Sequence, residues 1–135
     1  MANILVVDDD PLIQGAVRAS LQRHGFAVAL AGDGVEGLEI SARWPIDLAI
    51  VDLFMPNMEG IETLRTLRQR QPDLPVIVMS GSMQASGPRP PAGTNGKRPD
   101  FLSMAVALGA CATLQKPFSS EELNDMVVRH CKAAS

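Results

Sequence analysis

The chain has 135 residues, of which 46% are hydrophobic and 20% charged, and its formal net charge is −3. This length suits one domain, expected over residues 1–135, and the acidic balance argues against a general nucleic-acid or membrane-surface binder. No apolar run is long enough to span a bilayer. Cys111 and Cys131 stand in no redox or metal motif, and Met1 leads into the chain without a signal-peptide pattern, so we expect a cytoplasmic protein.

The first predicted unit is a strand followed by a helix. The wholly apolar run Ile4–Val7 predicts a buried strand, and three aspartates follow it. Asp10 precedes Pro11 and is a good N-cap for a helix that Gly25 ends. Capping explains Asp10 but leaves Asp8 and Asp9 unexplained. Next in order come a strand at 26–31, a turn at 32–34 and a short helix carrying Val35, Leu38 and Ala42.

The third apolar run, at about 46–51, leads to Asp52. Leu48–Val51 is apolar on every residue, which is typical of a strand buried on both faces. An unpaired carboxylate is costly inside such a strand, so Asp52 is expected at its C-terminal end. Open α/β sheets bind ligands at that edge. A lone aspartate there more often caps the next turn, but other charged groups reach the same edge.

The second half continues the alternation, with one interruption. A loop at 56–60, a helix at about 61–70 and a strand at 75–79 that ends at Ser80 are predicted. Residues 82–99 are rich in proline and glycine and carry only positive charges, which indicates a long flexible loop suited to partner docking. The remaining elements are a helix from about 101 to the cap at Gly109, a strand at 111–114 ending near Lys116, and a last helix that Ser119 and Glu122 begin as a capping box.

Five strand–helix units in succession predict a flavodoxin-like α/β fold. Right-handed crossovers give a doubly wound, five-stranded parallel sheet covered on both faces, commonly in the strand order 2-1-3-4-5. The switch point of that order lies between the first and third strands, where Asp8 and Asp9 face Asp52. Ser80 and Lys116 follow the fourth and fifth strands and reach the same edge.

Three carboxylates in one crevice need an explanation. At ~4 Å and an effective dielectric constant of ~20, each like-charged pair costs about 4 kcal/mol. Either the titrations couple and some acids stay protonated, or a cation joins them, and oxygen ligands alone suit Mg²⁺. Carboxylates, a divalent ion, a hydroxyl and a lysine are the groups that stabilise a transferring phosphoryl group, and a carboxylate can itself be the nucleophile.

The motifs resemble a known family. Ile4–Asp10, Val51–Asp52 with Met55–Pro56 and Gly60, Val78–Gly81 and Lys116–Phe118 are similar, in this order, to the receiver domain of bacterial two-component response regulators. The resemblance covers residues 3 to about 132, apart from the loop at 82–99. It implies a single-domain response regulator that accepts a phosphoryl group from a histidine kinase or histidine phosphotransfer protein. The signal would pass to an unknown partner by protein–protein contacts, without direct DNA binding, membrane insertion or turnover as an enzyme.

The resemblance also implies roles for single residues. Asp52 is the phosphoacceptor, and Ser80 and Lys116 contact the phosphoryl oxygens. Mg²⁺ is held by Asp9, Asp52 and the main-chain carbonyl of Phe54, with Asp8 acting through water. Ser80 and Thr113 stand at the switch positions, and the bond between Lys116 and Pro117 is cis. These roles are expectations carried over from the family.

The sequence departs from the family pattern and leaves alternatives open. Thr113 stands where the family usually has an aromatic switch residue, and the segment between Ser80 and Lys116 is long. A haloacid-dehalogenase-type phosphatase would use Asp8 and Asp10, but the acids after Lys116 lie on a predicted helix, and Asp52 would have no role. A receiver-like binding module without phosphorylation is a third interpretation, and the complete set of acids, serine and lysine argues against it.

Overall fold

The computed structural model describes residues 2–53, 59–80 and 105–131. The predicted loop at 82–99, Phe54 and the start of the helix before Gly109 lie outside the described residues. Five strands form one sheet: β1 (Asn3–Val7), β2 (Ala27–Ala31), β3 (Leu48–Asp52), β4 (Val76–Ser80) and β5 (Ala112–Gln115). The described helices are α1 (Pro11–Arg23), α2 (Gly34–Arg43), α3 (Glu59–Arg70) and α5 (Ser120–His130), and residues 105–107 are also helical.

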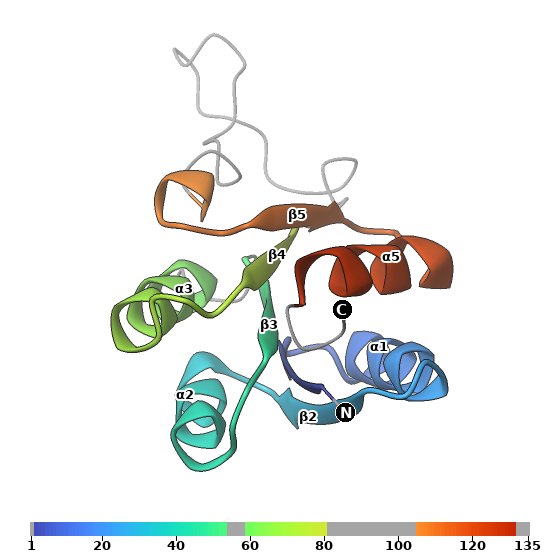
Figure 1. The fold of residues 1–135 in the computed structure, drawn as a ribbon, viewed down its shortest axis with the longest axis horizontal. Coiled ribbons are helices and arrows are strands. Elements are labelled where there is room, and N and C mark those ends of the chain that lie inside the picture. Colours follow the sequence, from blue (N-terminus) through green and yellow to red (C-terminus); the bar gives the residue numbers. More distant parts are fainter. Residues whose placement is uncertain (1, 54–58, 81–104, 132–135) are drawn as a thin grey trace, which may run out of the picture.

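The sheet confirms the predicted fold class. All described strand pairs are parallel, and the order is β2-β1-β3-β4-β5. Helices α1 and α5 cover one face, and α2 and α3 cover the other (Figure 1). Because β1 and β3 lie side by side, the ends of both strands open at the switch point of the sheet. The fold therefore brings Asp8, Asp9 and Asp52 to one edge.

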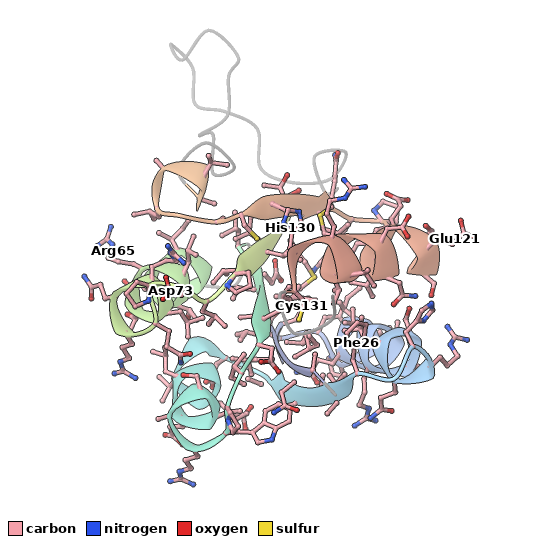
Figure 2. The ribbon with its side chains drawn as sticks, in the orientation of Figure 1. Phe26, Arg65, Asp73, Glu121, His130 and Cys131 are labelled. Atoms are coloured by element: carbon pink, nitrogen blue, oxygen red, sulfur yellow. The ribbon has the colours of Figure 1, made fainter. Side chains whose placement is uncertain are left out.

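Two apolar clusters pack on opposite faces of the sheet because strand side chains alternate between the faces. Leu5, Val7 and Val51 pack with Leu64 and Leu67 of α3. Ile4, Val6 and Ile50 pack with helices α1 and α5, where Figure 2 shows Phe26 and Cys131 on the inner side. The same view shows Arg65 and Glu121 pointing outward from α3 and α5. The apolar residues of β1, β3 and β4 are thus explained by burial on both faces.

Several element boundaries differ from the predictions. Helix α2 begins at Gly34, inside the turn expected at 32–34. It begins there because the Asp33 carboxylate accepts a hydrogen bond from the Glu36 N–H at 2.8 Å and caps the helix. Gly60, predicted in a loop, is a buried residue of α3. Strand β5 lies one residue later than predicted, at Ala112–Gln115.

Helix ends follow the predicted caps. Asp10 accepts a hydrogen bond from the Leu12 N–H, and Gly25 and Gly109 have φ values of 89° and 105°, which only glycine adopts without strain. Ser119 and Glu122 form the predicted capping box at the start of α5. Among the described residues, no helix combines the length and hydropathy needed to cross a bilayer.

Candidate functional site

Three consecutive aspartates follow β1, and they differ in burial. Asp8 is fully buried, whereas Asp9 and Asp10 are exposed. Oδ1 of Asp8 accepts a hydrogen bond from the Asp10 N–H at 2.9 Å, and the Asp10 carboxylate caps α1. Asp8 therefore faces the interior of the site while Asp9 stands at its opening.

Gln14 holds the main chain at Asp8, a role that sequence reasoning missed. Its amide Nε2 donates to the carbonyl oxygen of Asp8 at 2.7 Å and to that of Ala31 at 3.1 Å. The Asp8 N–H in turn donates to the Ala31 carbonyl at 3.0 Å. Together these bonds fix the backbone that carries Asp8 against the end of β2. The only signal in the sequence is a polar residue in the first turn of a helix, which is too common to single out.

Asp52 is the last residue of β3 and is 4% exposed. The register pairs Asp52 with Met79 of β4, and the following Leu53 N–H donates to the Met79 carbonyl at 3.0 Å. The ladder between β3 and β4 thus continues one residue beyond the aspartate. Its carboxylate consequently leaves the sheet from a well-held backbone, at the edge where the sequence placed it.

Lys116 follows β5 and joins two of the acids. Its ammonium group lies 2.9 Å from Oδ2 of Asp8 and 3.3 Å from Oδ2 of Asp52. Partial burial opposes the charge of the lysine, but the hydrogen bond to Asp8 and the charges of Asp52 and Asp8 outweigh it, so the pKa of Lys116 is raised. The peptide bond to Pro117 is cis, as the resemblance implied. Sequence reasoning placed Lys116 at this edge but missed that it bridges the acids.

The carboxylates of Asp8, Asp9 and Asp52 fit a divalent cation. One oxygen atom of each lies within 4.8 Å of the others. With the acids ionised, three negative charges and the one positive charge of Lys116 leave a formal charge of −2 in the cluster. A donor set made of oxygen atoms is the kind that Mg²⁺ takes. The residues present therefore suit this ion, and Asp9 offers the most exposed carboxylate.

The remaining predicted residues are placed in part. Ser80 ends β4, is 3% exposed, and its carbonyl oxygen accepts a hydrogen bond from the Lys116 N–H at 2.8 Å. Thr113 lies in β5, half-buried, and pairs with Val78 of β4. Phe54 lies in the part of the chain that is not described. Ser80 is thus brought to the same strand ends as Asp52 and Lys116, whereas Thr113 sits two residues back along the sheet.

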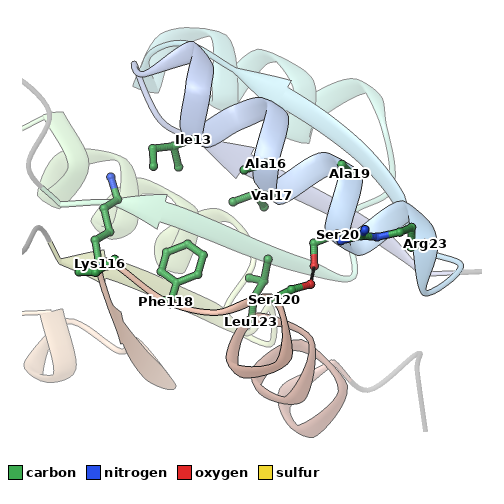
Figure 3. A pocket seen from close by; sticks show the side chains of 11 residues that line it. Ile13, Ala16, Val17, Ala19, Ser20, Arg23, Lys116, Phe118, Ser120 and Leu123 are labelled. Atoms are coloured by element: carbon green, nitrogen blue, oxygen red, sulfur yellow. Dashed lines mark hydrogen bonds between the residues drawn. The ribbon is translucent and has the colours of Figure 1, made fainter.

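A groove runs from the site along the surface between α1 and α5. It has a volume of about 370 Å³ and is lined mainly by apolar side chains, among them Ile13, Ala16, Val17 and Phe118. Lys116 and Arg23 also line it, and Figure 3 shows them at opposite ends of the groove. Ser20 and Ser120 also line the groove and are hydrogen-bonded to each other, and the Asn124 amide donates to Ser20 at 3.1 Å.

Comparison with known proteins identifies the class. The family model described as the response regulator receiver domain matches residues 4–88, and the chain belongs to this family. Receiver domains are signalling domains of two-component systems, and phosphorylation and Mg²⁺ binding are typical of them. The fold and the resemblance to the receiver family are thereby confirmed, and the phosphatase interpretation is set aside.

Individual relatives and solved structures show which proteins the chain is similar to. The chain is 38% identical over 123 residues to the response regulator MprA of Mycobacterium leprae, a match that covers 89% of this chain and 46% of the relative. It therefore spans about half the length of the curated relatives that it matches. Among solved structures, chemotaxis protein CheY4 of Vibrio cholerae is 29% identical with a TM-score of 0.80, covering 96% of this chain and 98% of that one. A CheY-like receiver domain from Methanospirillum hungatei is 25% identical, also with a TM-score of 0.80, and covers 96% and 92%.

Proposed function

We propose that this chain accepts a phosphoryl group on Asp52 from a histidine kinase or histidine phosphotransfer protein and passes the signal on by protein–protein contacts. The observation that carries the proposal is the bridge from Lys116 to Asp8 and Asp52 at the switch point of the sheet. A nucleophilic carboxylate beside an ammonium group supports the proposal, because phosphoryl transfer needs a nucleophile and positive charge near the phosphoryl oxygens. The proposal includes residues 1–135 as one receiver domain acting in the cytoplasm, where thiols such as Cys111 stay reduced.

The proposed step is an in-line displacement at phosphorus. An oxygen atom of Asp52 forms the new P–O bond while the P–N bond to the donor histidine breaks, and the electron pair of that bond stays on the imidazole. With acetyl phosphate as the donor, a P–O bond breaks instead and acetate leaves. Lys116 can turn from the carboxylates to the phosphoryl oxygens, whose negative charge its ammonium neutralises. The Ser80 hydroxyl, from the neighbouring strand end, donates to another of these oxygens.

Asp9, Asp52 and the carbonyl of Phe54 are the proposed ligands of Mg²⁺, with Asp8 acting through water. The bound ion would supply positive charge at the developing phosphoryl oxygens. Asp8 would also hold Lys116, since its Oδ2 makes the shorter of the two bonds to the ammonium group. Thr113 and Ser80 remain the proposed switch positions. The segment 82–99, outside the described residues, remains a proposed partner surface on the strength of its basic composition.

The phosphodonor would dock along the groove between α1 and α5. The groove ends at Lys116, whose ammonium contacts Asp52, so a protein bound along it lies against the phosphoacceptor. Its apolar floor suits one face of a helix, and Arg23 at the far end suits an acidic side chain.

The variant Ala16→Trp should fill this groove. We expect the rate of transfer from a phosphorylated histidine kinase, relative to the rate of transfer from acetyl phosphate, to fall about tenfold or more. A tenfold change corresponds to about 1.4 kcal/mol of free energy.

The control for the groove is Ala42→Trp, which adds the same bulk at an exposed position of α2. An Ala16→Trp variant whose rate ratio matches that of Ala42→Trp would remove the donor from the groove without touching the assignment of Asp52.

The test of the phosphoacceptor is Asp52→Asn. Wild-type protein incubated with acetyl phosphate and Mg²⁺ should gain one acid-stable, base-labile phosphoryl group, and Asp52→Asn should gain none. Asp33→Asn is the matched control, because Asp33 is an exposed helix cap and asparagine caps a helix equally well. Labelling of Asp52→Asn at the wild-type level would contradict the proposal.

A further inference from the structure

Helix α3 approaches the backbone at Asp52 so closely that a side chain would not fit between them. Gly60 is buried in the first turn of α3. A Cβ atom at this position would overlap the carbonyl oxygen of Asp52. It would also lie 2.7 Å from the Cα of Leu53, a distance that real Cβ atoms hardly ever show, and 3.0 Å from the carbonyl carbon of Asp52, which is tighter than most Cβ contacts. The atoms in the way belong to the backbone, which cannot rotate aside as a side chain can.

The same peptide unit is held from the other side by β4. The Leu53 N–H donates to the Met79 carbonyl at 3.0 Å, and Asp52 pairs with Met79 in the strand register. The unit joining Asp52 to Leu53 is thus confined between a hydrogen bond to the sheet and the bare backbone of α3. Its position sets how far the Asp52 carboxylate extends toward Lys116, 3.3 Å away, and toward the carboxylates of Asp8 and Asp9.

We infer that Gly60 is a positioning residue for the phosphoacceptor. Because Gly60 has no side chain, α3 can pack closely against the end of β3. This packing holds Asp52 where its carboxylate lies near both Lys116 and the acids proposed to bind the metal. The inference rests on the proposed function, because it concerns how Asp52 is presented to the incoming phosphoryl group. Gly60 itself contacts neither the phosphoryl group nor the metal and acts through the backbone of Asp52.

The variant Gly60→Ala tests the inference. A methyl group at this position requires a backbone displacement of about 1 Å, and misplacement of this size costs up to about 10²-fold in rate. We expect the rate of labelling by acetyl phosphate, at saturating Mg²⁺ and donor, to fall about tenfold to a hundredfold. Affinity for Mg²⁺, measured by calorimetry without donor, should fall as well, because Asp52 moves relative to Asp9.

Two other helix glycines provide the controls. At Gly37 of α2 a Cβ atom would lie 2.8 Å from Cγ2 of Val7, so the crowding is similar but the obstacle is a side chain. Gly37→Ala should lower the melting temperature and leave labelling per folded molecule and Mg²⁺ affinity unchanged. At Gly15 of α1 a Cβ atom meets nothing within 4 Å, so Gly15→Ala should raise the melting temperature by favouring the helix.

The decisive comparison is made in the stabilised background. Gly15→Ala is combined with Gly60→Ala or with Gly37→Ala, and all rates are measured well below the melting temperature. Slow labelling and weak Mg²⁺ binding in the Gly60 double variant alone support the inference. Equal rates in the two double variants would show that α3 gives way instead of Asp52, and an unfolded Gly60 double variant would make the residue a folding determinant; either result overturns the inference. Failure of the proposed function is distinguishable, because Asp52→Asn would then label like wild type.

Discussion

Lys116 and Asp8 form an ion pair between a partly buried ammonium group and a fully buried carboxylate. The ammonium and Oδ2 of the carboxylate are 2.9 Å apart, and the two side chains are 17% and 0% exposed. Asp52 lies on the other side of the same ammonium group. One lysine therefore offsets the charge of two buried carboxylates.

Replacing Lys116 by methionine should destabilise the metal-free protein. The change keeps most of the volume but removes the positive charge that lies against Asp8 and Asp52, and breaking a buried pair typically costs about 3–5 kcal/mol. Mg²⁺ should recover part of the loss, because the ion offers positive charge to the same acids. The measurement is urea unfolding with and without Mg²⁺. Arg18→Met, at an exposed position of α1, is the control and should change stability by no more than about 0.5 kcal/mol.

The stabilisation from Lys116 should disappear at high pH. The pKa of this lysine is raised in the folded protein, despite the opposing effect of burial, by the hydrogen bond to Asp8 and by the charges of Asp52 and Asp8. Its contribution is therefore complete below the unfolded pKa of about 10.4 and is lost as the pH rises through the higher folded value. We expect the stability difference between wild type and Lys116→Met to be constant near neutral pH and to shrink above about pH 10.4. If the stability difference between wild type and Lys116→Met stays the same from neutral pH to above about pH 10.4, this linkage is contradicted.

Asp9 should govern the response of stability to Mg²⁺. A ligand that binds only the folded state adds about 2.7 kcal/mol at a concentration of 100 times its Kd. The melting temperature of wild type should accordingly rise with Mg²⁺, whereas that of Asp9→Ala should rise less. Without metal, Asp9→Ala should melt no lower than wild type, because one repelling charge is gone. Asp10→Asn is the neighbouring control, since its helix cap is retained. An identical metal response in Asp9→Ala and wild type would remove Asp9 from the metal site.

The aspartyl-phosphate should be long-lived for this family. In receivers, the side chain two positions after the phosphoacceptor flanks the approach of the hydrolytic water, and here it is Phe54, which has no group to orient water. Phe54 is not among the described residues, and the prediction rests on the sequence. Phe54→Asn should accelerate loss of phosphate after the donor is removed, with Mg²⁺ affinity little changed. The check is a time course of phosphoprotein, and equal decay rates would show that water positioning at this residue does not limit hydrolysis.

The sequence predicted the fold well because each element has a local cause. Apolar runs such as Ile4–Val7 are buried on both faces, and Asp10 and Ser119 cap helices where their patterns indicate. Right-handed crossovers predicted a parallel sheet covered on both faces, and the strand order is the common one for a five-stranded sheet of this kind. Asp8, Asp52 and Lys116 could be assigned to one edge for the same reason.

What the sequence did not provide are the contacts made across the fold. The bond between Lys116 and Asp8 depends on the distance between two strand ends, and no local sequence pattern encodes that distance. The sequence predicts Gly60 in a loop, and only the approach of α3 to the backbone of Asp52 shows why a side chain is excluded there. Gln14 likewise holds the Asp8 backbone through a tertiary contact.

The ion pair also bears on how the chain folds. Asp8 and Lys116 are 108 positions apart, and they meet only when β5 has been added to the edge of β4. A chain with only its first four strands in place holds Asp8 and Asp52 with no ammonium between them. We infer that the acidic cluster assembles late, because the contact between Lys116 and Asp8 spans a long stretch of sequence and such contacts form slowly. We therefore expect the bridge from Lys116 to the two aspartates to form only when the whole sheet is complete.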